Sequence, residues 1–123
     1  MPTRHVYPFE KLPVWESAWR LVSNVYKATR VFPRSELYGL TSQTNRAAVS
    51  ASANLAEGSA RSSRKDQAHF SQIADGSLME LACLLVLAVD LGFLSTNEES
   101  DLRVEIESVS RQLNALRKSQ ASS

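Results

Sequence analysis

All four prolines of this 123-residue chain lie before residue 34. Proline lacks a backbone N–H and its ring clashes with the preceding turn, so it interrupts helices. After residue 33 nothing prevents long helices, and no stretch alternates polar and apolar residues for long enough to predict a strand. The chain is therefore predicted to be all-α. At this length one domain can bury a core without disulfides, and the single cysteine cannot form one within the chain.

Apolar side chains recur every three or four residues in four segments, which predicts four helices. These cover residues 13–29, 38–57, 64–91 and 96–118, with Ser95 as an alternative start of the last. Pro13 suits a first helical turn, Ser63 with Asp66 resembles a capping box, and Gly92 suits a left-handed cap. The second helix is predicted to end before Gly58. The apolar seam of the fourth consists of Leu102, Ile106, Val109, Leu113 and Leu116.

Short connections between four helices favour antiparallel neighbours. The sequence therefore predicts an antiparallel up-down-up-down four-helix bundle over residues 13–118. Residues 1–12 are predicted to be an N-terminal extension, and residues 119–123 a disordered tail.

The second half of the third helix, LMELACLLVLAV, is apolar nearly all round. A helix without a polar face must be covered on every side, and in so small a domain only another subunit can readily do that. We therefore expect a homo-oligomer, with Cys83 as an inert core residue. The stretch is shorter than the roughly 20 residues of a membrane span and contains Glu80. With no secretory pattern in the first 13 residues, a cytoplasmic protein without a membrane segment is expected.

Charge is distributed unevenly along the chain, with +6 over residues 1–65 and −5 over residues 66–123. An up-down-up-down bundle brings the start of the first helix, the second connection and the end of the fourth helix to one end. This end gathers seven cations, namely Arg4, Lys11, Arg61, Arg64, Lys65, Arg117 and Lys118. Such a cluster predicts nucleic-acid binding through phosphates, without base specificity. The alternative is that these side chains only solvate a loop.

A polar stripe recurs along the second helix at intervals of three and four residues: Gln43, Arg46, Ser50, Asn54 and Glu57. It could line a site, but the favoured interpretation is a buried network in which Arg46 pairs with Glu80 of the third helix. No nucleophile and no second carboxylate accompany the stripe, so no catalytic residue is predicted.

The sequence gives little indication of a metal site, a phosphate-binding loop or aromatic stacking on bases. His5 and His69 stand apart from other ligand types, so no metal site is expected. No glycine-rich phosphate loop is present, and no cofactor is predicted. Trp15 and Trp19 could stack on bases, but their position beside Val22 and Tyr26 favours packing.

Three segments carry a family resemblance: FEKLPVWESAWRLV, FPRSELYGLTSQTNRAAVSASANLAEGSAR and FSQIADGSLMEL. In this order and spacing they resemble the bacterial four-helix-bundle family of 23S rRNA intervening-sequence proteins, related to the accessory variability proteins of diversity-generating retroelements. The resemblance covers Phe9 to Lys118. It departs at Ala51 to Ala53, where the family often has an Ile-Pro-like pair.

The resemblance implies a four-helix protomer in a ring, typically a homopentamer, with a positively charged surface and no catalytic residues. For the retroelement branch it implies contact with a reverse transcriptase and RNA. Two functions follow as hypotheses. One is a non-enzymatic, homo-oligomeric accessory protein that binds RNA or DNA through its basic end; the other is a scaffolding oligomer that binds a protein partner.

Overall fold

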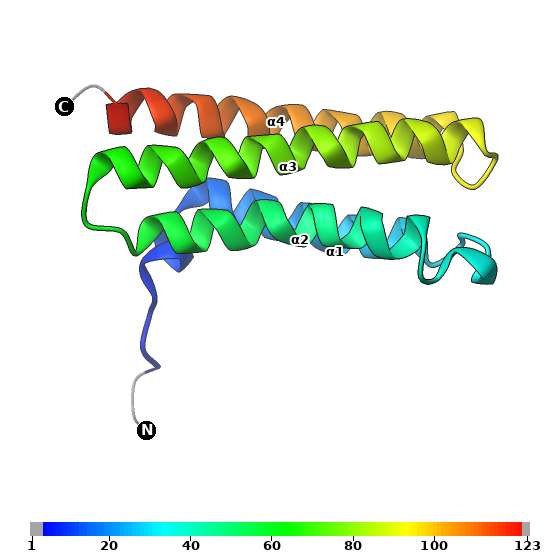
Figure 1. The fold of residues 1–123 in the computed structure, drawn as a ribbon, viewed down its shortest axis with the longest axis horizontal. Helices are drawn as coiled ribbons and strands as arrows, with labels where there is room; N and C mark the ends of the chain where they lie inside the picture. Colours follow the sequence, from blue (N-terminus) through cyan, green and yellow to red (C-terminus); the bar gives the residue numbers. More distant parts are fainter. Residues whose placement is uncertain (1–3, 122–123) are drawn as a thin grey trace.

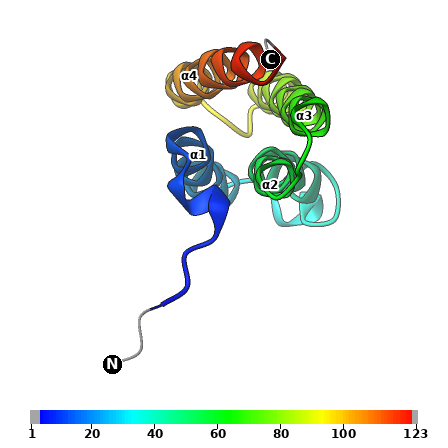
Figure 2. The same cartoon turned by 90° about the vertical axis from the view of Figure 1, so that its left-hand side faces the viewer.

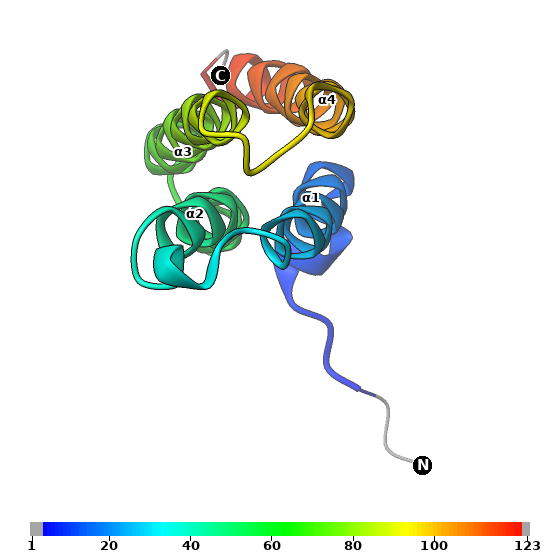
Figure 3. The ribbon, with the colours of Figure 1, turned by 90° about the vertical axis from the view of Figure 1, so that its right-hand side faces the viewer.

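The computed structural model describes residues 4–121, which contain four α-helices and two short 3-10 helices and no strand. The elements are η1 (Pro8–Lys11), α1 (Pro13–Thr29), η2 (Arg34–Glu36), α2 (Leu40–Ser59), α3 (Arg64–Asp90) and α4 (Thr96–Ala121). Seen end on, the four long helices form a square in which each packs on the helices before and after it, and α4 closes on α1 (Figures 2 and 3). Successive helices run in opposite directions (Figure 1). The predicted all-α up-down-up-down bundle is confirmed.

Local sequence signals fix several helix ends. The Ser63 hydroxyl oxygen accepts the Asp66 N–H at 3.0 Å and caps α3. Ser95 and Glu98 form a reciprocal capping box at the start of α4, with bonds of 3.0 and 3.2 Å. After α3, Gly92 has a φ of 78°, and the Phe93 N–H reaches the carbonyl of Ala88 at 2.9 Å. The glycine is needed there because side-chain-bearing residues rarely adopt this conformation.

The predicted bounds of the second helix are wrong at both ends. The helix begins at Leu40 rather than at residue 38, and it continues to Ser59 with Gly58 inside it. Gly58 is buried against α3, where a Cβ atom would lie 2.8 Å from the Cβ of Phe70. The glycine therefore permits a close helix crossing and does not end the helix.

Both chain ends also differ from expectation. Within the predicted extension 1–12, Pro8–Lys11 form η1. The Phe9 ring packs against the Trp15 ring, with their centroids 4.8 Å apart. The predicted tail from residue 119 is wrong as far as Ala121, because α4 continues to that residue. The Ser71 hydroxyl donates to Gln120 Oε1 at 3.0 Å and ties the last turn of α4 to α3. Residues 1–3 and 122–123 lie outside the described residues.

The core is built from leucine and valine rows that pack against small residues. The largest fully buried side chains are Leu21, Val25, Thr44, Leu78, Leu81, Leu85, Val109 and Leu113. Opposite them α2 presents Ala47, Ala48 and Ala51, which lets its backbone come close to its neighbours. Phe32 and Phe93, with ring centroids 6.0 Å apart, close the core at the end of the bundle that holds the first and third connections.

One side of α3 stays exposed in the protomer. Its Leu78, Leu81 and Leu85 are buried, but Met79, Cys83, Val86 and Leu87 face outward and form what we call the apolar stripe. The expectation that Cys83 is a core residue is therefore wrong for the single chain. An 18-residue window of α3 has a mean hydropathy of 1.7, enough by length and composition to cross a membrane, and 28% of it is buried. The buried leucine row is equally typical of a core helix in a globular protein.

Gly58→Ala is expected to destabilise the fold by about 1–3 kcal/mol, because the new methyl group would press on Phe70 and force α2 and α3 apart. The matched control is Gly76→Ala in the middle of α3, where an added Cβ meets nothing within 4 Å. That change should stabilise the helix by about 0.5–1 kcal/mol. Urea unfolding of both variants at one protein concentration measures the difference, and equal effects at the two positions would contradict the close crossing.

Candidate nucleic-acid interface

Three of the predicted cations meet in one groove between α3 and α4. Its volume is about 620 Å³, and its lining consists of Lys65, Ala68, His69, Gln72, Asn114, Arg117 and Lys118. The groove lies at the end of the bundle where α3 begins and α4 ends (Figures 1 and 2). We call it the basic groove.

The helices place these side chains by periodicity and length. Lys65 stands in the first turn of α3, and His69 and Gln72 follow after four and three residues, so all three project from one side of that helix. Asn114 and Arg117 share a face of α4 in the same way. The Ser110 hydroxyl donates to Asp75 Oδ1 at 2.8 Å, which holds the two helices together beside the groove.

The charge of the groove is positive because no carboxylate lines it. Arg117 is the one partly neutralised cation, with its Nη2 3.9 Å from Asp75 Oδ2 and a hydrogen bond to the Asn114 side-chain oxygen. Lys65 and Lys118 are exposed and form no ion pair with any described residue. The two lysines are free to pair with an anionic ligand, and Arg117 belongs to the same lining.

The other four predicted cations lie outside the basic groove. The Arg61 guanidinium is 4.7 Å from the centre of the Phe70 ring, on the side of α3 that faces α2. Arg64 lines a separate hollow of about 320 Å³ between η1 and the ends of the helices. Arg4 pairs with Glu10 at 3.7 Å, and Lys11 is exposed on η1. Cations that share one end of the bundle thus point to different sides of it, because they come from different segments, and because Arg64 and Lys65, consecutive in α3, differ in direction by about 100°.

His69, Gln72 and Asn114 line the groove but were not among the predicted site residues. Each of the three adds hydrogen-bonding capacity that suits phosphate or sugar oxygens. The four- and three-residue spacing from Lys65 to His69 and Gln72 is a signal that a sequence search for polar faces could use. The pairing of that face with Asn114 required the tertiary structure.

Comparison with known families agrees with the resemblance that the quoted segments carry. The sequence profile of the 23S rRNA-intervening sequence protein family matches residues 10–115, which is most of the chain. The chain belongs to this family. No curated protein sequence matches it significantly.

In this family member the polar stripe of α2 is not buried, since its residues are exposed or half-buried. Gln43, Arg46 and Ser50 line a groove of about 270 Å³ together with Ser77 and Glu80 of α3. Arg46 and Glu80 are both exposed, and they form no ion pair. The predicted buried Arg46–Glu80 network is therefore wrong.

A hydroxyl contact joins the two helices at this groove instead, and an amide hydrogen bond within α2 supports it. The Ser50 and Ser77 hydroxyls lie 2.8 Å apart, and Asn54 Nδ2 donates to the Ser50 carbonyl at 2.8 Å. Glu57 lies exposed further along α2. The buried face of α2 includes the small residues Ala47, Ala51 and Gly58. The polar stripe occupies neighbouring helical positions and therefore lies at the edge of that face.

The aromatic residues of the family member divide between packing and exposure. Trp15 packs against the core as expected, but Trp19 is 54% exposed, and packing within the protomer does not account for it. The Trp15 and Trp19 rings stack with centroids 5.5 Å apart, and Phe9 and Tyr7 continue the row. Within residues 4–121, no group of three or more His, Cys, Asp or Glu side chains could hold a metal ion.

A double-mutant cycle on Arg46→Gln and Glu80→Gln checks the exposed polar groove. Because both side chains are solvated and unpaired in the protomer, the coupling energy for unfolding should stay below about 0.5 kcal/mol. Urea unfolding of the two single variants and the double variant gives this value. A coupling of about 3 kcal/mol or more would indicate a buried pair and contradict the exposed geometry.

Proposed function

We propose that this protein is a non-enzymatic, homo-oligomeric accessory protein of the cytoplasm that binds RNA or DNA through the basic groove. The observation that carries the proposal is the meeting of Lys65, Arg117 and Lys118 in one groove with no carboxylate in its lining. Ammonium and guanidinium groups in one concave surface attract the phosphates of a nucleic-acid backbone. Membership of a family whose name refers to a 23S rRNA intervening sequence agrees with a nucleic-acid setting.

The composition of the groove supports contacts to phosphate and sugar rather than readout of bases. His69 is the one ring in the lining, which leaves little surface on which bases could stack. Gln72 and Asn114 can donate to phosphate or ribose oxygens as readily as to base edges. We therefore expect little sequence preference. The groove offers cations and amides rather than a nucleophile with a neighbouring base, which favours binding over catalysis.

The apolar stripe supports the oligomeric part of the proposal. Met79, Cys83, Val86 and Leu87 are neighbours on the outer side of one helix, and water contact with such a stripe is unfavourable. A second copy of the chain that covers it would also repeat the basic groove in each subunit. A symmetric ring would gather these grooves, and five subunits is the number that the family resemblance implies.

The stripe also supports the alternative function, a scaffold that binds a protein partner. A partner such as a reverse transcriptase, which the retroelement branch implies, could cover the same apolar residues. Recovery of a protein partner after nuclease treatment, together with groove variants that have no effect on nucleic-acid binding, would favour this alternative over the first function.

Neutralising the basic groove should weaken nucleic-acid binding and its salt dependence. For Lys65→Ala/Arg117→Ala/Lys118→Ala, the slope of log K against log salt should fall by about 1 for each cation that touches a phosphate. Fluorescence anisotropy with a single-stranded RNA and a duplex DNA, at several salt concentrations, measures this slope.

The control removes the same charge outside the groove, with Arg20→Ala/Lys27→Ala/Arg111→Ala, and should leave most of the slope in place. Asp75→Asn should tighten binding, because it removes the carboxylate beside Arg117 while keeping an oxygen that can accept from Ser110. Equal effects of the groove variant and the Arg20/Lys27/Arg111 control would overturn the groove as the interface.

Charges placed in the apolar stripe should dissociate the oligomer. Met79→Glu/Val86→Glu is expected to give monomers by light scattering, because two carboxylates would be buried without partners in the interface. Cys83 is the sole cysteine, so its reaction with a thiol reagent should be slow in the native assembly and fast in this variant. The control Val104→Glu changes an exposed valine on α4 and should leave both readouts unchanged. A native protein that is monomeric, with a rapidly reacting Cys83, would contradict the assembly.

A further inference from the structure

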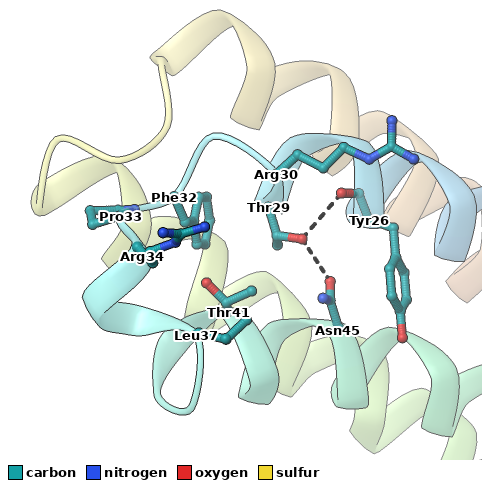
Figure 4. Close-up of a pocket in the computed structure, with 9 residues that line it drawn as sticks. All are labelled: Tyr26, Thr29, Arg30, Phe32, Pro33, Arg34, Leu37, Thr41 and Asn45. Carbon is teal, nitrogen blue, oxygen red and sulfur yellow. Dashed lines mark hydrogen bonds between the residues drawn. The ribbon is translucent and has the colours of Figure 1, made fainter.

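A second cationic hollow lies at the opposite end of the bundle from the basic groove. It opens beside the connection between α1 and α2, has a volume of about 410 Å³, and we call it the corner pocket (Figures 1 and 4). Tyr26, Thr29 and Arg30 border it from the end of α1, and Thr41 and Asn45 border it from α2 (Figure 4). Its volume lies in the range of small-molecule sites, roughly 300–1,000 Å³.

The charges of the corner pocket favour an anion. Arg30 and Arg34 both line it, and no carboxylate does. Neither arginine forms an ion pair with a described residue. The nearby carboxylate of Glu36 is turned toward the start of α2, where its Oε1 accepts the Leu40 N–H at 3.1 Å. Two exposed guanidinium groups are therefore left without a partner, one on each side of the hollow (Figure 4), and guanidinium suits phosphate geometry.

The uncharged polar groups of the pocket also leave donors free. The buried Thr29 hydroxyl lies 3.2 Å from the Tyr26 carbonyl and donates to Asn45 Oδ1 at 2.9 Å, which turns the Asn45 amide nitrogen toward Thr41 (Figure 4). That nitrogen and the Thr41 hydroxyl have no hydrogen-bond partner among residues 4–121. The lining thus presents an amide and a hydroxyl donor in addition to the two arginines.

The remaining walls of the pocket are apolar, and about half of the surface of two of their side chains is exposed to solvent. Tyr26 is 44% exposed and Leu37 is 50% exposed, while Phe32 is buried at the base against Phe93. A flat ring lying against Tyr26 and Leu37 would remove part of that surface from water. The donors of the pocket match a phosphate group, and its apolar walls match a planar ring. A phosphate ester that carries a planar ring combines the two.

We propose that the corner pocket binds a small phosphorylated ligand of the nucleoside monophosphate class. Arg30 and Arg34 hold the phosphate, Thr41 and Asn45 donate to its oxygens or to the sugar, and the ring lies against Tyr26 and Leu37. This site does not involve the basic groove, and it stands whether or not the groove binds nucleic acid.

Calorimetric titration of the full chain with AMP, adenosine and inorganic phosphate tests the proposal. AMP should bind saturably, and each fragment alone should bind at least about tenfold more weakly, since each uses only part of the pocket. Arg30→Ala/Arg34→Ala should weaken AMP binding by about tenfold or more, and Thr41→Val by a smaller factor at nearly constant shape. The matched control Arg20→Ala/Arg111→Ala removes the same charge elsewhere and should leave binding unchanged.

The groove variant Lys65→Ala/Arg117→Ala/Lys118→Ala separates the two sites and should keep native AMP affinity. The proposal is overturned if AMP fails to bind at millimolar concentration. It is also overturned if adenosine binds as tightly as AMP, or if the groove variant and not the Arg30/Arg34 variant abolishes binding.

Discussion

The contact between α2 and α3 depends on residues with almost no side chain. Gly58 lies against the Cβ of Phe70 so closely that an alanine there would overlap it, and Ala47 and Ala51 continue the small face along α2. Ser50 and Ser77, 2.8 Å apart, join the helices where the backbones are near. Because small side chains bury little area each, the close approach itself must supply the dispersion contacts that stabilise this side of the bundle.

This crossing sets the orientation of α3 and so determines which surfaces remain for function. With its leucine row turned inward, α3 presents the apolar stripe to the outside and lines the basic groove with α4. Association through the stripe and anion binding in the groove are thus proposals about one helix. The two surfaces follow one another along this helix, with the groove at Lys65 to Gln72 and the stripe at Met79 to Leu87.

The two ends of the bundle differ in the kind of anion they suit. The basic groove is open and lined mainly by flexible lysines and amides, which suits a continuous phosphate backbone. The corner pocket is smaller and combines two arginines with aromatic and aliphatic walls, which suits a single compact ligand. Both sites contain clustered cations. They differ in shape and in the apolar residues that line them, and these two properties distinguish a site for a polymer from a site for a small ligand.

By itself, the sequence determined the helix count, the span of α1, the caps at Ser63 and Gly92, and the end of the bundle at which the cations gather. These depend on local periodicity and on backbone groups a few residues apart. Only the tertiary structure decided that Gly58 belongs inside α2 and that Arg46 and Glu80 are exposed. It also decided that Lys65 and Arg117 line one groove while Arg61 faces Phe70. The reason is that the rotation of each helix about its axis is set by packing against its neighbours, and this rotation decides which side chains share a groove.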